Sequence, residues 1–229
     1  MKPKHKVLII GDSHTRKCSS ILQNNLNMDN KVFSFVKPIA LMKELMKTAN
    51  EEVNSLTNDD VVIVWGGVRD ISRNNVKEAL KSIQEFVKEN KELNVMLINS
   101  PHRHDLSPVS CVNHEVTKYN RQMLKIVKLQ PHVKVIETKL DRMHFSMHGL
   151  HLNSKGKESV SSTLAMVVQQ FFDEKRPSII PIPWKDSPLV EPKQDTQDSN
   201  VDDGRINSDQ TTQHRRICPA RRNPDFLWI

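Results

Sequence analysis

The stretch that decides the fold is VLIIGDSH, residues 7–14, in which four apolar residues end at a polar turn. Such a run before Gly-Asp predicts a buried strand that closes in a tight turn. Ile21, Leu22 and Leu26 follow with helical spacing, so we expect Ser13 between a strand and the amino end of a helix. Ligands bind at that edge of parallel sheets. Ser13 is therefore a candidate nucleophile, and the alternative is a simple N-cap.

The chain up to Pro177 repeats this alternation of apolar runs and helical stripes. Further strands are predicted at 31–36, 61–65, 93–98 and 133–136, and helices at 41–53, 76–87, 116–126 and 154–172. Strands that alternate with helices pair in parallel through right-handed crossovers. We expect an α/β fold, a three-layer α/β/α sandwich whose five-stranded parallel sheet has the flavodoxin-like order 2-1-3-4-5.

Length and composition predict one folded domain and a tail. The 229 residues suit a single domain of ordinary size, but 37% hydrophobic and 5% aromatic residues are low for a chain that folds throughout. After Pro177 the chain becomes rich in Pro, Gln, Asp and Ser without an apolar period. We expect an α/β domain at 1–177 and a disordered tail at 178–229 with basic and apolar segments at its end.

The tail ends in DFLWI, residues 225–229, behind two basic clusters. This pattern predicts a short motif that docks on a protein partner, and the alternative is an unselected remnant of a longer polypeptide. Residues 179–229 carry seven Lys and Arg against eight Asp and Glu, a charge of −1, so the preceding part, with 27 against 19, carries +8. That excess leaves nucleic-acid binding open, although no compact stripe of arginine and aromatic residues favours it.

Cysteine usage and the short N-terminal apolar run argue against several protein classes. Cys18, Cys111 and Cys218 are widely spaced, so neither a disulfide framework nor a zinc site is indicated. The run at 7–10 is too short for a signal peptide, and no stretch is long enough to span a membrane. We expect a cytoplasmic protein that does not associate with membranes.

The histidine loop, residues 141–153 with the sequence DRMHFSMHGLHLN, is the second chemical cluster. No cysteine or acidic partner completes a metal-ligand set around its three histidines, so we expect neither a metal nor a cofactor. The loop follows the fifth predicted strand and is able to fold back over the sheet edge. There His151 would approach Ser13 and accept the hydroxyl proton as a neutral imidazole.

In their order along the chain these blocks resemble the SGNH hydrolases, the GDSL-type esterases, over roughly residues 6–172. The first block matches as Gly11-Asp12-Ser13, the third in part as Gly67-Val68-Arg69-Asp70, and the last as His148-Gly149-Leu150-His151. The resemblance implies a serine hydrolase that acts on an ester or another small acylated substrate, with Ser13 as nucleophile and His151 as general base. The histidine loop and PHRHDL at 101–106 are also similar to esterase-like domains of invertebrate mobile elements.

Three positions depart from the family pattern. Ile39 stands where the resemblance implies a glycine that donates its N–H to the oxyanion, and Arg69 replaces an asparagine donor. With Ser13 and Gly67 they make up the predicted oxyanion site. His148 replaces the usual aspartate and is the candidate third member, although one imidazole orients another poorly. A Ser–His dyad, with Asp141 or a backbone carbonyl orienting the histidine, is the alternative.

Asp12, His14 and Arg103 are the predicted substrate-binding residues. The Asp12 carboxylate is suited to accept backbone N–H groups in the turn, and His14 either lines the cleft or occupies an exposed first helical turn. Arg103 would bind an anionic substrate, unless its loop is an ordinary polar loop in which Asp105 forms an ion pair. The sequence thus leaves two functions: a serine esterase, or an interaction module that keeps the fold without the chemistry.

Overall fold

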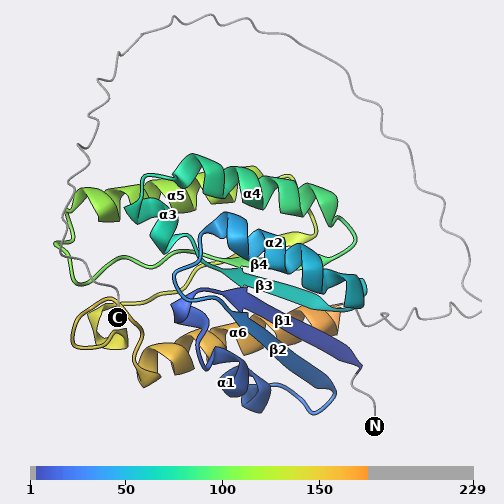
Figure 1. The fold of residues 1–229 in the computed structure, drawn as a ribbon. Helices are drawn as coiled ribbons and strands as arrows, with labels where there is room; N and C mark the ends of the chain where they lie inside the picture. Colours follow the sequence, from blue (N-terminus) through green and yellow to red (C-terminus); the bar gives the residue numbers. More distant parts are fainter. Residues whose placement is uncertain (1–3, 175–229) are drawn as a thin grey trace, which may run out of the picture. The chain divides into compact units, whose positions relative to one another are not determined.

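The computed structural model describes residues 4–174, which form a five-stranded sheet between two layers of helices (Figure 1). The strands are β1 His5–Gly11, β2 Asn30–Val36, β3 Val61–Trp65, β4 Asn94–Ile98 and β5 Val133–Ile136. All neighbouring strands pair in parallel, in the order β2-β1-β3-β4-β5. The predicted α/β class and strand order are confirmed.

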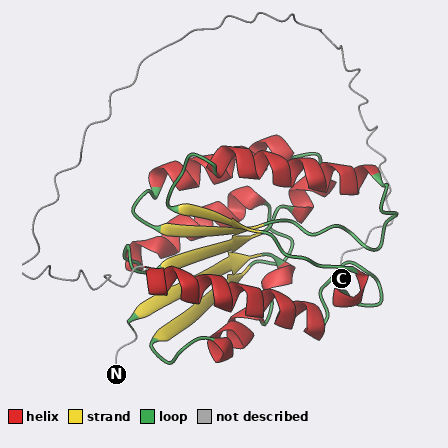
Figure 2. Cartoon of the chain, turned by 180° about the vertical axis from the view of Figure 1, so that it is seen from behind, coloured by secondary structure: helices red, strands yellow, loops and turns green. Residues whose placement is uncertain are grey.

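Helices cover both faces of the sheet (Figure 2). They are α1 Cys18–Asn25, α2 Met42–Glu52, α3 Val68–Ser72, α4 Val76–Glu89, α5 Cys111–Val127 and α6 Ser154–Glu174. One core lies between the sheet and α2, α4 and α5, and the other lies between the sheet and α1 and α6. Alternate residues of β1 serve the two cores, with Leu8 and Ile10 in the first and Val7 and Ile9 in the second. Burial on both faces explains the continuous apolar runs of the central strands.

Two local predictions are wrong. Ser13 does not lie at the amino end of an α-helix, because Ser13–Thr15 form a single 3-10 turn and α1 begins only at Cys18. Lys17, with φ 69°, adopts the left-handed conformation between the two and interrupts the helical hydrogen bonds. The stretch 66–71, predicted as a loop, contains most of the short helix α3, which starts after Gly67 with φ 102°.

The predicted tail at 178–229, including the DFLWI segment, lies outside the described residues. Within residues 4–174, none of the helices combines the length and the apolar character that a membrane crossing requires.

Candidate active site

Three loops leave the sheet at the same edge. Gly11 pairs with Val36 of β2 and with Trp65 of β3, so these three strands end level with one another. The Asp12 N–H donates to the Trp65 carbonyl at 3.1 Å, and the Lys37 N–H donates to the Gly11 carbonyl at 2.8 Å. The β1 loop (residues 12–17) is therefore fastened to both the β2 loop (residues 37–41) and the end of β3.

The β1 loop holds Ser13 through its neighbours. The Asp12 carboxylate accepts the His14 N–H at 2.9 Å, and the Asp12 carbonyl accepts both the N–H and the hydroxyl of Thr15. Ser13 is half-buried in this turn. Asp12 thus accepts a backbone N–H in the turn, as the sequence indicated. Its carboxylate also makes a second contact, which the sequence did not indicate.

That second contact is to the ring of His14, which is only 4% exposed. Its Nδ1 lies 2.9 Å from Asp12 Oδ1, and its Nε2 lies 3.3 Å from the Leu150 carbonyl oxygen. The alternative of an exposed His14 is wrong, because the ring is enclosed between the β1 loop and the histidine loop. The ring centroids of His14 and His151 are 6.2 Å apart.

His151 is half-buried beside this contact. Burial lowers its pKa, and the adjacent His14 lowers it further, whereas Asp12 opposes both effects. The ring is therefore neutral at neutral pH, which is the form that accepts a proton. Within residues 4–174 no hydrogen bond joins the Ser13 hydroxyl to the His151 ring. In unliganded sites such contacts are often long and tighten only with substrate.

The two candidate partners of His151 lie elsewhere. His148 is exposed in a turn and, among the described residues, forms neither a hydrogen bond nor an ion pair with His151. The carboxylate of Asp141 instead lies 2.8 Å from Nδ1 of His144. Asp12 is the carboxylate whose charge acts on His151, with His14 as its direct partner. Sequence reasoning missed this link, for which the Asp-x-His spacing was the available signal.

The backbone at Ile39, a residue of the predicted oxyanion site, has a conformation typical of glycine. Ile39 has φ 64°, in the left-handed region that β-branched residues rarely adopt. The N–H groups of Ser13, Ile39 and Gly67 have no hydrogen-bond acceptor within the described part of the chain. All three therefore remain available to donate to a ligand.

The β3 end is held by buried polar groups. Gly67 has φ 102°, and a Cβ there would lie 2.7 Å from the Tyr119 hydroxyl, so only glycine fits. Asp70, fully buried on α3, accepts the Met42 N–H at 2.8 Å and so fastens α3 to the start of α2. Burial raises the pKa of Asp70, and the hydrogen bonds to it oppose that effect. Arg69 is half-buried, and its guanidinium has no hydrogen bond or ion pair within residues 4–174.

Comparison with solved structures supplies the context for this geometry. A lipase/acylhydrolase from Enterococcus faecalis has a similar fold, with 16% sequence identity and a TM-score of 0.61 over 76% of this chain and 97% of that one. A member of the lipolytic G-D-S-L family from Veillonella parvula is also similar, with 13% identity and a TM-score of 0.62 over 72% of this chain and 99% of that one. The chain has the fold of the GDSL-type lipases and esterases. A carbohydrate acetylesterase from Sinorhizobium meliloti shares this GDSL-type fold, with 12% identity and a TM-score of 0.61 over 74% of this chain and 100% of that one.

No family model and no curated protein matches the sequence. At these low identities the structural similarity shows the GDSL-type fold alone, without its activity. The comparisons do not support the predicted similarity to mobile-element domains, which stays a prediction.

In this GDSL-type fold Arg103 is already paired. The residue is 8% exposed, its guanidinium hydrogen bonds to both carboxylate oxygens of Asp105, and Asn113 binds its backbone N–H and carbonyl. Burial acts to raise the pKa of Asp105, but the contacts from Arg103 bring it below the ordinary value. The geometry thus favours the ion-pair alternative over the binding of an anionic substrate. Its neighbour His104 donates its N–H to the Gly149 carbonyl at 3.0 Å.

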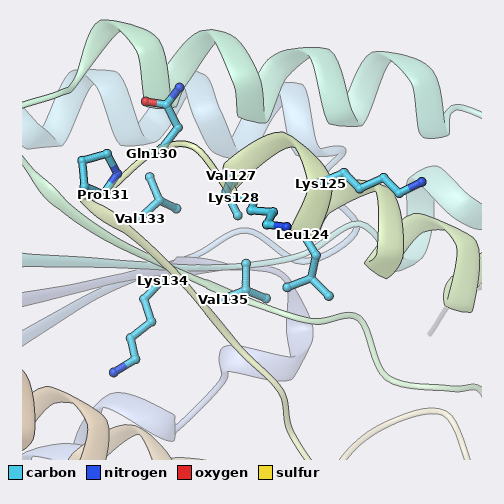
Figure 3. A pocket seen from close by; sticks show the side chains of 9 residues that line it. All are labelled: Leu124, Lys125, Val127, Lys128, Gln130, Pro131, Val133, Lys134 and Val135. Carbon is cyan, nitrogen blue, oxygen red and sulfur yellow. The ribbon is translucent and has the colours of Figure 1, made fainter. Parts of the chain in front are cut away.

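Among the surface depressions of residues 4–174 that neither Ser13 nor His151 lines, two lie next to β5 or the segment that follows it. One, of about 500 Å³, lies between the end of α5 and β5 and is lined by apolar residues and lysines, as Figure 3 shows. Its lining consists of Leu124, Lys125, Val127, Lys128, Gln130, Pro131, Val133, Lys134 and Val135. The other, of about 440 Å³, lies where β4 and β5 end, between Asn99 and Asp141. Among residues 4–174, no three His, Cys, Asp or Glu side chains are arranged to hold a metal ion.

Proposed function

We propose that this chain is a serine hydrolase of the GDSL type that cleaves an ester or another small acylated substrate, with Ser13 as nucleophile and His151 as general base. The observation that carries the proposal is the contact between His14 and the Leu150 carbonyl at 3.3 Å. It joins the residue after Ser13 to the residue before His151, so the two candidate groups lie on loops in direct contact. The acetylesterase among the similar structures supports a short acyl group.

In the proposed reaction the Ser13 hydroxyl attacks the carbonyl carbon of the ester while its proton passes to His151. The negative charge that develops on the carbonyl oxygen is received by the N–H groups of Ser13, Ile39 and Gly67, which have no competing acceptor among the described residues. When the tetrahedral intermediate collapses, His151 returns the proton to the departing alcohol. Water then attacks the acyl-enzyme while its proton passes to His151, the ester bond to Ser13 breaks, and His151 returns the proton to the Ser13 oxygen as the acid leaves.

His14 is excluded as the base by its own contacts. Both ring nitrogens already face acceptors, Asp12 Oδ1 and the Leu150 carbonyl, so no lone pair is directed at Ser13. His151, whose ring nitrogens make no hydrogen bond within residues 4–174, has a lone pair available. Because no carboxylate within residues 4–174 contacts His151, we propose a catalytic Ser–His dyad.

A binding module that keeps the fold is the second candidate. It is favoured by the missing hydrogen bond between Ser13 and His151 and by Arg69, whose longer side chain cannot take the place of the asparagine that the family pattern implies. Loss of one oxyanion donor typically costs about 100- to 1,000-fold in rate. An enzyme with this site is therefore expected to hydrolyse esters slowly, whereas a binding module would not hydrolyse them at all.

Hydrolysis of p-nitrophenyl acetate by the full chain tests the proposal. Ser13→Ala should reduce the rate to that of unspecific surface reaction, and His151→Ala should reduce it by about 100- to 10,000-fold, the usual contribution of a general base. His102→Ala is the matched control, because His102 is an exposed histidine whose ring, within residues 4–174, hydrogen bonds only to Thr117. If wild type and Ser13→Ala, both folded, hydrolyse the ester equally, the enzyme proposal fails and the binding module remains.

A further inference from the structure

The buried ring of His14 lies among groups that favour a positive charge. One nitrogen faces the Asp12 carboxylate at 2.9 Å, and the other faces the Leu150 carbonyl at 3.3 Å. A neutral imidazole has one N–H and can donate to only one of these two acceptors, whereas the doubly protonated ring donates to both. The indole of Trp65, 5.6 Å away between ring centroids, is a further favourable neighbour for a cation.

The other charged groups around the ring come from three elements. Asp12 belongs to the β1 loop, Lys157 belongs to α6, and the titratable ring of His151 belongs to the histidine loop, while Arg16 of the β1 loop acts on His151. Cys18 of α1 donates to the His14 carbonyl, and burial raises the pKa of this thiol to about 11, so it stays uncharged.

Burial and Lys157 lower the pKa of His14. The charge and hydrogen bond of Asp12, together with the Leu150 carbonyl, raise it by more, so the pKa lies above its ordinary value of 6.5.

We propose that His14 is a positioning residue that remains protonated at neutral pH, clamps the histidine loop to the Ser13 turn, and keeps the adjacent His151 neutral by charge repulsion. The role of His14 in catalysis rests on the proposed hydrolase function, whereas the charge of the His14 ring does not depend on that function. In this arrangement a buried cation, itself paired with Asp12, stands beside the base in place of a carboxylate. The arrangement extends the neutral form of His151 to lower pH and makes His151 a weaker base.

The direct test is a pH titration of the full chain with its histidines labelled with 15N, followed by NMR. In the wild type His14 should stay doubly protonated through pH 7, and His151 should titrate below 6.5. His14→Gln keeps a donor of similar reach but removes the charge, so the His151 midpoint should rise by about one pH unit. His132→Gln is the matched control, because the His132 ring hydrogen bonds, among the described residues, only to the Val87 carbonyl, and the change should leave the His151 midpoint in place.

The proposal is overturned if wild-type His14 is neutral at pH 7 or if His14→Gln leaves the His151 midpoint in place. Should His14→Gln fail to fold, Asp12→Asn provides a second variant, in which loss of the carboxylate should lower the His14 midpoint. These titrations need no activity. A chain that titrates as expected but hydrolyses no ester refutes the hydrolase function alone, and an active chain with an unmoved His151 midpoint refutes the role of His14 alone.

Discussion

The strain at Ile39 yields a sharp prediction about stability. Ile39 has φ 64°, where a side chain with a Cβ costs about 1–2 kcal/mol and glycine costs nothing. Ile39 is 43% exposed, and replacing it by either Ala or Gly removes the same part of the side chain beyond Cβ. The two variants therefore differ mainly in whether the strain persists.

Glycine at residue 39 relieves the strain but gives the unfolded chain more freedom, which costs about 0.4–1 kcal/mol. Taking the middle of both ranges, we expect Ile39→Gly to be more stable than Ile39→Ala by about 0.8 kcal/mol. Urea unfolding of the full chain, followed by circular dichroism, measures both free energies of unfolding.

The control is the same pair of substitutions at Lys47, an exposed residue within α2. In a helix interior alanine is favoured over glycine by about 1 kcal/mol, so the order of the two variants should reverse. If Ile39→Ala proves as stable as Ile39→Gly or more stable, the left-handed conformation of residue 39 is refuted, and with it the argument that this loop keeps the glycine-like oxyanion geometry.

Two further predictions concern the histidine loop and its pH dependence. Gly149 has φ 75°, and a Cβ there would lie 2.5 Å from the His104 carbonyl carbon, so Gly149→Ala should destabilise the fold by about 2 kcal/mol. Urea unfolding measures this loss, and an unchanged midpoint would contradict the packing of the two loops. Labelling of the wild type by a fluorophosphonate should rise with pH with a midpoint below 6.5, because the neutral form of His151 reacts and its pKa is lowered. A midpoint above 6.5 would show that the surroundings stabilise the charged ring instead.

The sheet was predictable because its signal is local. Val61–Trp65 is apolar at every position, and in the structure every one of these residues is buried, as a strand covered on both faces requires. Helix α3 escaped prediction because its five residues are too few to show a period. The helix starts after Gly67, whose positive φ is compatible with a glycine but cannot be predicted from the sequence.

The candidate site was only partly predictable, because its decisive contact joins distant parts of the chain. His14 lies 136 residues from Leu150, and no local pattern reveals that their loops touch. The same contact buries His14, for which the sequence favoured an exposed position in the first helical turn. Arg103 and Asp105 are two residues apart, so their pairing could be anticipated, whereas the burial of Arg103 against Asn113 depends on how α5 packs.

A covalent serine probe shows whether Ser13 is a nucleophile activated by His151. The full-length wild type is treated with a fluorophosphonate, and the modified residue is located by mass spectrometry. We expect a single adduct on Ser13 that is absent from Ser13→Ala, strongly reduced in His151→Ala and retained in His102→Ala. A folded wild type without an adduct on Ser13, or equal labelling of Ser13 in His151→Ala, would contradict it.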